Sequence, residues 1–444
     1  MRRWNRLWDV VLGVIVSLLC AFPVSAREKV ILDSDMVEGF DDGVAMLALA
    51  QSPGIELMGV TIVAGNTWVS DGVAYALRQL EIAGQNIPVA AGVDRPFRPQ
   101  RYELFGLERQ LFGMGHDAWV GAFGYPKPES WQKVYRERYG KEPQSRPDPR
   151  HAVDFIIEEV RKHPGELTIV EIGPCSNLAL AVLKAPDIVP LIKRVIFMGG
   201  SFFKPGNVTP TAEFNWGFDP EAARIVVRTP FREQIMVGLD VCEKMPFSFD
   251  RYQAFLAGQR PEMKKLLEST YAGQQFAKDK AFSQYVWDVL AAAILIDPSL
   301  ITEERTCAVD VNAEFGPSYG QALAYPDNGP QGSQKARIVM TIDQERFWNR
   351  FRDEPLHIGK TPGSFSRRFV FPCLTRSVSK KQASRYNGIP FIPSHSPPKA
   401  LEKRRLGGEG ATLHQKDVPL PANTDFSFPS YAASCSSYGK GYSP

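Results

Sequence analysis

Four aspartates crowd into ten residues near the N-terminus, and their spacing favours a cation site. They follow the short apolar run at residues 29–32 and are Asp33, Asp35, Asp41 and Asp42. Carboxylates held this close repel one another unless protons or a cation neutralise them. The segment has no His or Cys, and oxygen ligands suit calcium or magnesium. An acidic turn in which Asp42 caps a helix is the alternative, but a cap needs only one Asp. The sequence therefore predicts a hard divalent cation.

The elements around this segment predict an α/β fold with a mostly parallel sheet flanked by helices. Strand-like runs and amphipathic segments alternate along the chain, with strands expected at 55–63, 88–91, 167–172 and 195–198 and helices at 73–83 and 177–183. Ligands in such sheets bind at the carboxyl ends of the strands. Polar residues directly after apolar runs are therefore the candidates for function. Residues 98–146 are irregular and predict a long loop region, whereas residues 251–283 predict helix.

Composition and charge exclude several classes of protein. Hydrophobic residues make up 44% and charged residues 23% of the 444, which is typical of a globular chain. Basic and acidic residues number 52 and 49, a balance that argues against nucleic acid as a partner. The cysteines are few and form no CxxC pair, so we expect Cys175, Cys242 and Cys307 to be buried free thiols.

The two ends differ from the body of the chain. Residues 1–26 have a basic start, an apolar stretch and small residues before Arg27, which predicts a cleaved secretory signal and a secreted or periplasmic protein. A membrane anchor is the alternative, but about 13 apolar residues are too few to span a bilayer, so no membrane contact is expected after cleavage. Residues 361–444 are rich in Ser, Pro and Gly and predict a disordered tail, which leaves 27–360 as the catalytic body.

Several further motifs, in chain order over residues 29–348, resemble the nucleoside hydrolase family, which includes inosine-uridine and purine-preferring nucleoside N-ribohydrolases. The aspartate segment matches the opening motif of that family, although its loop is about two residues longer than usual. The other matching segments are Val63–Asn66, Glu171–Asn177, Phe197–Gly200, Gly206–Asn207, Ala212–Asn215 and Asp219–Ala223. The resemblance implies the nucleoside hydrolase fold, hydrolysis of the N-glycosidic bond of ribonucleosides, and a homodimer or homotetramer.

The resemblance also implies a role for individual residues. Calcium would be held by the carboxylates of Asp35, Asp42 and Asp288 and by the backbone carbonyl of Ile172. Asp35 would in addition take a proton from the attacking water. The ribose would be held by Asp41, Asn66, Asn207, Glu213 and Asn215. Such a site stabilises an oxocarbenium-like transition state with nearby negative charge and a fixed sugar.

The residue before Asp288 bears on the preferred base. Pyrimidine-accepting members of the family have a His there that protonates the leaving base, whereas this chain has Trp287. A Trp at this position is similar to the pattern of purine-preferring members, so we expect Trp287 to stack on a purine. Four other residues are weaker candidates for an opposite wall, and a structural role is expected for each of them: Trp68, Phe105, His116 and Trp119.

Two other functions remain open from the sequence. Asp33 to Val37 superficially fits the Asp-x-Asp motif of haloacid-dehalogenase-like phosphatases, but the Asn-rich motifs of the middle of the chain have no role in phosphoryl transfer. The second alternative is a secreted nucleoside- or sugar-binding protein without catalysis. Retention of all three metal carboxylates argues against it.

Overall fold

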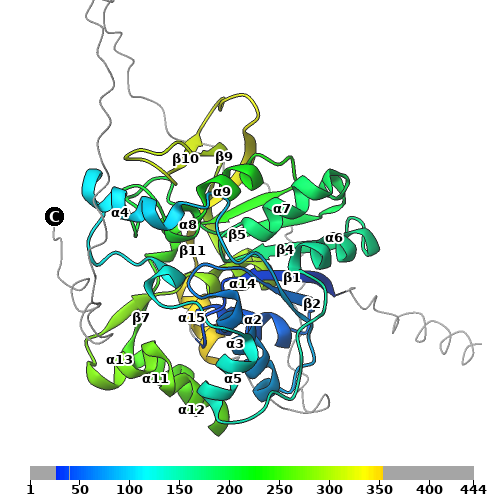
Figure 1. Ribbon diagram of the computed structural model, residues 1–444, viewed down its shortest axis with the longest axis vertical. Coiled ribbons are helices and arrows are strands. Elements are labelled where there is room, and N and C mark those ends of the chain that lie inside the picture. The colour runs from blue at the N-terminus through cyan, green and yellow to red at the C-terminus, as the bar shows by residue number, and fades with distance from the viewer. Residues whose placement is uncertain (1–26, 40, 354–444) are drawn as a thin grey trace, which may run out of the picture. The chain divides into compact units, whose positions relative to one another are not determined.

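A nine-stranded sheet forms the centre of the protein, which the computed structural model describes at residues 27–39 and 41–353 (Figure 1). The strands lie in the order β10-β9-β11-β6-β5-β4-β1-β2-β3, and all neighbours from β11 to β3 are parallel. At the other edge, β9 pairs antiparallel with β11 and β10. The bounds are β1 (Glu28–Ser34), β2 (Ile55–Ile62), β3 (Val89–Ala91), β4 (Leu167–Glu171), β5 (Arg194–Met198), β6 (Gln234–Val237), β9 (Ile301–Val311), β10 (Ala322–Tyr325) and β11 (Gln334–Ile342). A separate hairpin-like pair consists of β7 (Pro246–Ser248) and β8 (Ser283–Tyr285).

Helices cover both faces of the sheet because alternate strand residues point to opposite sides. In β1, Val30 and Leu32 join the core beneath one helical layer, whereas Ile31 joins the core beneath the other. The first layer includes α2 (Asp42–Gln51), α3 (Val69–Ala83) and α14 (Asp288–Ile296), and the second includes α6 (Ala152–Lys162), α7 (Ser176–Lys184) and α9 (Pro220–Val227). Figure 1 shows the two layers on either side of β1 and β4. The predicted α/β class and mostly parallel sheet are confirmed.

The order of the strands determines where a ligand site can form. β1 lies between β2 and β4, so the chain leaves β1 towards one edge of the sheet and later returns to its other side. In parallel sheets the crevice beyond the strand ends at such a reversal binds ligands. The aspartate segment follows β1, and Ile172 follows β4. Both segments therefore reach the same crevice.

Two parts of the chain differ from what the sequence indicated. Residues 98–146, expected as loop, contain α4 (Arg101–Leu111), the 3-10 turn η1 (Gly121–Gly124) and α5 (Trp131–Tyr139). Residues 251–283, expected as helix, divide into α11 (Phe249–Ala257), α12 (Pro261–Ser269) and α13 (Tyr271–Lys278), after which β8 begins. The loop prediction for 98–146 was wrong because short helices separated by Gly and Pro show little periodicity. The remaining helices are η2 (Pro186–Leu191), α8 (Phe214–Phe218), α10 (Leu239–Cys242), η3 (Pro298–Leu300) and α15 (Gln344–Asp353).

A buried arginine holds α4 against the body. Arg101 is fully buried and donates to the carbonyl of Gly217 in α8 through Nε (2.9 Å) and Nη2 (2.6 Å). Its Nη1 donates to Glu108 at 3.0 Å, and the ring of Phe105 lies against the guanidinium. These contacts hold α4 against α8, although the sequence of α4 shows only a weak helical pattern.

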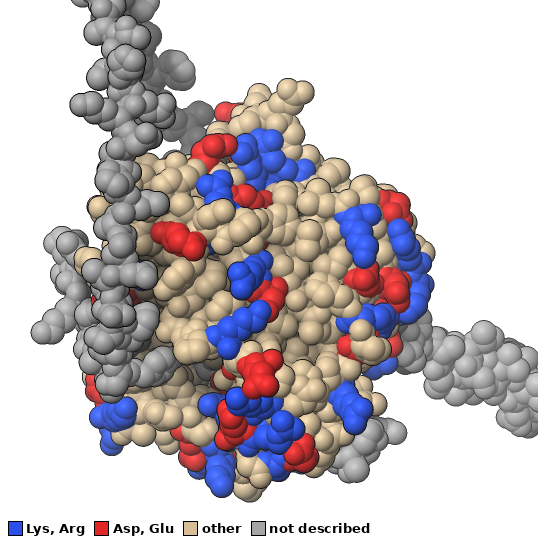
Figure 2. All heavy atoms as spheres, viewed as in Figure 1, with Lys and Arg blue, Asp and Glu red and all other residues tan. Residues whose placement is uncertain are grey.

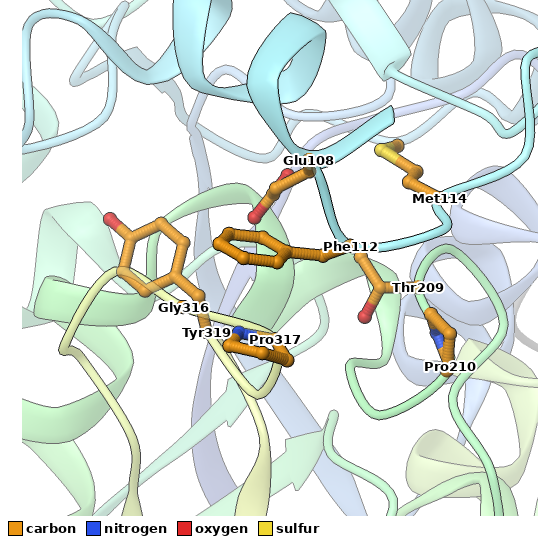
Figure 3. A pocket seen from close by; sticks show the side chains of 8 residues that line it. All are labelled: Glu108, Phe112, Met114, Thr209, Pro210, Gly316, Pro317 and Tyr319. Atoms are coloured by element: carbon orange, nitrogen blue, oxygen red, sulfur yellow. The ribbon is translucent and has the colours of Figure 1, made fainter. Parts of the chain in front are cut away.

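A small cavity adjoins this contact (Figure 3). Its volume of about 10 Å³ is enough for a single water, so it is no substrate site. One oxygen of Glu108, Oε1, is buried beside it without a hydrogen-bond partner. The lining residues are Glu108, Phe112, Met114, Thr209, Pro210, Gly316, Pro317 and Tyr319.

Other sequence expectations fall partly within the described residues. Cys175, Cys242 and Cys307 are buried and free, as expected. No helix within residues 27–39 and 41–353 has the length and apolarity to cross a membrane. On the face shown in Figure 2, basic and acidic side chains are interspersed. The predicted signal at 1–26, the predicted tail at 361–444 and the junction at 354–360 all lie outside the described residues.

Replacing Arg101 by Met is expected to destabilise the fold by about 3 kcal/mol, because Glu108 would remain buried without its cation. The double variant Arg101→Met/Glu108→Leu is expected to recover most of this loss. Thermal unfolding of the three proteins measures the effect, with Lys133→Met as a control because Lys133 belongs to an exposed ion pair with Glu129. An Arg101→Met variant that melts at the wild-type temperature would show that Arg101 does not anchor α4.

Candidate active site

The side chain of Asp35 lies in a cradle of glycines at the end of β1. Its Oδ2 accepts the backbone N–H of Asn66 at 2.6 Å, and its side chain is fully buried. A Cβ at Gly65 would overlap Asp35 Oδ2 and lie 2.7 Å from Pro174 Cδ. A Cβ at Gly173 would lie 2.8 Å from the Asp35 nitrogen. Glycine is therefore required for the strands to close around Asp35.

Asp42 is buried beside Asp35 at the start of α2. Its Oδ1 accepts the hydroxyl of Ser34 at 2.7 Å, and its carboxyl also contacts that of Asp35. Burial raises the pKa of Asp42, although the bond from Ser34 opposes this shift. No side chain caps α2 at this end, so the capping interpretation of Asp42 is wrong. Asp42 instead faces the other carboxylates.

Asp41 connects the first loop to α14. Its Oδ2 accepts the backbone N–H groups of Trp287 (2.6 Å) and Asp288 (2.7 Å), and its Oδ1 accepts that of Val289 at 3.2 Å. These donors open α14, so Asp41 satisfies the helix end from another part of the chain. Burial raises the pKa of Asp41 to about 7, against the effect of these bonds.

Asp288 completes a group of four buried carboxylates. Burial is the largest cause that raises its pKa well above the ordinary value, and the charges of Asp41, Asp42 and Asp35 add to it. Burial and the charge of Asp42 likewise raise the pKa of Asp35. Asp35 follows β1, Asp41 and Asp42 lie at the start of α2, and Asp288 begins α14, so the fold gathers negative charge at one point. Among the described residues, no three His, Cys, Asp or Glu side chains already have the arrangement of a formed metal site.

Asp33 lies behind this group, and the protein bonds one of its two oxygens, whereas Oδ2 is buried without a hydrogen-bond partner among the described residues. Its Oδ1 accepts the hydroxyl of Thr61 and the amide of Asn177, the latter at 2.8 Å. Burial raises its pKa to about 6, and the carboxyl of Glu171 lies against it. Asp33 and Glu171 face each other across β1 and β4, which fixes the strand ends that carry Asp35 and Ile172.

Asn66 is held on two sides by the segment that follows α4. Its side-chain Oδ1 accepts the indole N–H of Trp119 at 2.7 Å, and its carbonyl accepts the hydroxyl of Tyr125 at 2.7 Å. Trp119 is 44% exposed, which places an accessible aromatic surface next to Asn66. These two contacts fix the orientation of the Asn66 side chain.

The segment after β5 brings three more predicted residues together. Glu213 accepts backbone N–H groups of Gly200, Asn215 and Trp216 at 2.9, 2.7 and 3.2 Å, and thereby caps α8. Burial raises the pKa of Glu213 to about 7. Asn207 Oδ1 accepts the backbone N–H of Phe214 at 2.9 Å. This segment is therefore fixed by its own polar side chains.

Asn215 joins that segment to the end of β4. Its Nδ2 donates to the carbonyls of Ile172 and Met198, both at 3.1 Å. Its Oδ1 is buried and has no partner among the described residues. A buried amide oxygen without a donor is costly, so this atom is available to a ligand hydroxyl.

The aromatic residues divide between the site and the core. Trp287 is half-buried directly before α14, and Tyr285 packs edge-on to it with ring centres 6.1 Å apart. Phe105 is a core residue, as expected, and Trp68 is buried. His116 is exposed on the segment that precedes Trp119.

The predicted site residues therefore lie together, and the sequence missed those that support them. Tyr125 was not recognised, and Trp119 was ranked low although it contacts Asn66. Both lie in the region taken as loop, where no periodic pattern marks them. Nothing in the local sequence of that segment signals contacts with a residue 53 or 59 positions away in the chain.

A buried acidic cluster and an amide-rich rim lie at the reversal point of a parallel sheet, where ligands bind in α/β folds. Residues 30–349 match the family model for inosine-uridine preferring nucleoside hydrolases, and the chain belongs to that family. It is a nucleoside N-ribohydrolase, which removes the phosphatase and non-catalytic alternatives.

Individual relatives agree with this assignment. The pyrimidine-specific ribonucleoside hydrolase RihB of Escherichia coli is 32% identical over 326 residues, 72% of this chain and 95% of RihB. A plant nucleoside hydrolase, PpNRh1, has a similar structure with a TM-score of 0.60 and 27% identity, over 74% of this chain and 99% of its own. A purine-preferring ribonucleoside hydrolase from Gardnerella vaginalis gives 0.59 and 26% over the same shares.

Gly65→Ala is expected to lower kcat/KM for a ribonucleoside by at least about tenfold, because the new methyl group displaces the carboxylate of Asp35. Gly106→Ala is the matched control, since a Cβ there meets nothing within 4 Å. Steady-state release of ribose measures both variants. Equal rates for Gly65→Ala and wild type would show that the position of Asp35 is not critical.

Proposed function

We propose that this protein is a calcium-dependent ribonucleoside hydrolase that prefers purine nucleosides and acts in a secreted or periplasmic compartment. The observation that carries the proposal is the convergence of Asp35, Asp42 and Asp288, which are buried and mutually repelling, at the sheet edge where Ile172 follows β4. The compartment rests on the predicted signal at residues 1–26 alone.

The donor set at the site fits calcium. Asp35 Oδ1 is buried and receives no hydrogen bond from any described residue. All candidate ligands are oxygen atoms, and the pKa values of Asp35 and Asp288 are raised first by burial and then by the neighbouring negative charges. Asp35, Asp42, Asp288 and the Ile172 carbonyl would hold the ion. When bound there, the ion would polarise water and would bind sugar hydroxyls.

The residues of the chain provide the rest of the proposed chemistry. Asp35 accepts the proton of the attacking water, since its Oδ1 has no hydrogen-bond partner among the described residues and its pKa is raised by burial. Asn215 uses its unpartnered Oδ1 to accept a ribose hydroxyl. Asp41, Asn66, Asn207 and Glu213 complete the sugar site. Their negative charge and dipoles favour the oxocarbenium-like transition state.

The proposed purine preference rests on Trp287. Its position before α14 is fixed through the backbone bond to Asp41, and the ring is supported by Tyr285. An indole provides a stacking surface but no proton donor for a pyrimidine. RihB is named pyrimidine-specific and the Gardnerella protein purine-preferring, so the relatives do not decide the base.

Asp35→Ala and Asp288→Ala are each expected to abolish hydrolysis, because each removes a calcium ligand and the first also removes the proton acceptor. The wild type is expected to melt at a higher temperature with calcium than with a chelator, since only the folded state binds the ion. Ribose release and thermal unfolding, each with and without chelator, test both statements. Activity of Asp35→Ala above a tenth of wild type in chelator would refute the mechanism.

Inosine is expected to exceed uridine in kcat/KM by more than about tenfold, a difference of about 1.4 kcal/mol in transition-state energy. Trp287→Ala is expected to remove most of this difference by slowing inosine. Tyr102→Ala is the matched control, because it removes a half-exposed aromatic ring from α4 rather than from the α14 boundary. Comparable wild-type values for the two nucleosides would reject the purine preference.

A further inference from the structure

The loop between Asp35 and Asp41 contains a buried carboxylate that accepts hydrogen bonds from another part of the chain. Glu38 lies in this loop, and only 3% of its side chain is exposed. Its Oε2 accepts the guanidinium of Arg138, with Nε at 2.8 Å, and its Oε1 accepts the hydroxyl of Tyr139. Both donors lie at the end of α5, a helix that contributes no residue to the proposed sugar or calcium sites.

The same loop is held from inside by α3. The Oε1 atom of Gln79 accepts the backbone N–H of Gly39 at 2.9 Å, and its Nε2 lies 3.7 Å from the sulfur of Met36. Gly39 has a φ of +76°, which favours glycine, and a Cβ there would lie 2.8 Å from Thr270 Cγ2. The loop is therefore fixed on both sides over its middle residues.

The two supporting helices also contact each other. The guanidinium of Arg138 lies over the ring of Tyr75 in α3, 5.2 Å from its centre. Arg138 thus joins α3, α5 and Glu38 in one arrangement. The charge of Glu38 is matched by Arg138, so this carboxylate is not an additional ligand of the acidic cluster.

The need for such support follows from the place of the loop. The loop joins Asp35 to Asp41, and the residues between them allow conformations in which the two aspartates move apart. The carboxylates on either side repel one another, which favours conformations that separate them. We propose that Glu38 is a positioning residue: its bonds to Arg138 and Tyr139 set the spacing of the proposed calcium ligands. This inference rests on the proposed calcium dependence.

Calcium titration calorimetry of the full chain tests the inference with Glu38→Gln and Arg138→Met. Positioning predicts that both variants raise the Kd for calcium by about tenfold, or about 1.4 kcal/mol. A purely electrostatic effect predicts opposite signs, because removal of the Arg138 charge would tighten calcium binding. Arg136→Met is the matched control, since Arg136 lies on the same helix and pairs at 3.6 Å with the exposed Glu142. Its Kd is expected to stay at the wild-type value.

Further measurements separate positioning from loss of folding. The double variant Glu38→Gln/Arg138→Met is expected to bind calcium no more weakly than the weaker single variant, because the pair acts as a unit. At saturating calcium, kcat is expected to return to the wild-type value in each variant. Melting in chelator reports global stability. Should Arg138→Met fail to fold, Tyr139→Phe, which removes one hydrogen bond to Glu38, is expected to raise the Kd by about twofold to threefold.

The outcomes distinguish this inference from the proposed function. A wild-type chain that binds no calcium overturns both. Wild-type binding with an unchanged or lower Kd in Arg138→Met overturns the role of Glu38 and leaves the calcium-dependent function intact. If Tyr139→Phe is used in place of Arg138→Met, an unchanged Kd for calcium likewise overturns the role of Glu38.

Discussion

Mutual repulsion among buried carboxylates is the constraint on which the rest of this structure depends. Asp35, Asp41, Asp42 and Asp288 are all nearly inaccessible to water, and burial raises the pKa of each. Backbone N–H groups and the Ser34 hydroxyl offset part of that cost. In the proposed function, the remaining negative charge would attract a cation and would stabilise a positively charged sugar in the transition state.

The fold meets this constraint by making each part of the site support another. Asp41 caps α14 and so fixes Asp288, whereas Asn215 bonds to the carbonyl of Ile172 and so joins the sugar-binding segment to β4. Trp119, from a distant segment, donates a hydrogen bond to the side chain of Asn66 and so fixes its orientation. A ligand would therefore meet groups whose orientations are already determined, which reduces the reorganisation needed during the reaction.

The sequence predicted the parts of this arrangement that obey a local rule. Strand ends followed by polar residues identified the positions of Asp35 and Asn66, because alternation of strands and helices directs such residues to one edge of the sheet. The partners of these residues obeyed no local rule. The bond between Asp41 and the start of α14 joins residues that are 247 positions apart in the sequence. The helix α4 is held by Arg101, and a charged side chain would be expected at the surface from the sequence, although this one is buried.

Calorimetric titration of calcium into the wild-type chain at about pH 6, in two buffers with different ionisation enthalpies, tests the central claim most directly. Because burial raises the pKa values of the folded carboxylates, protons compete with a cation at this site, so binding of calcium is predicted to release protons and to occur at one site per chain. The heats in the two buffers would then differ in proportion to their ionisation enthalpies. Absence of binding, or binding with equal heats in both buffers, would contradict the account.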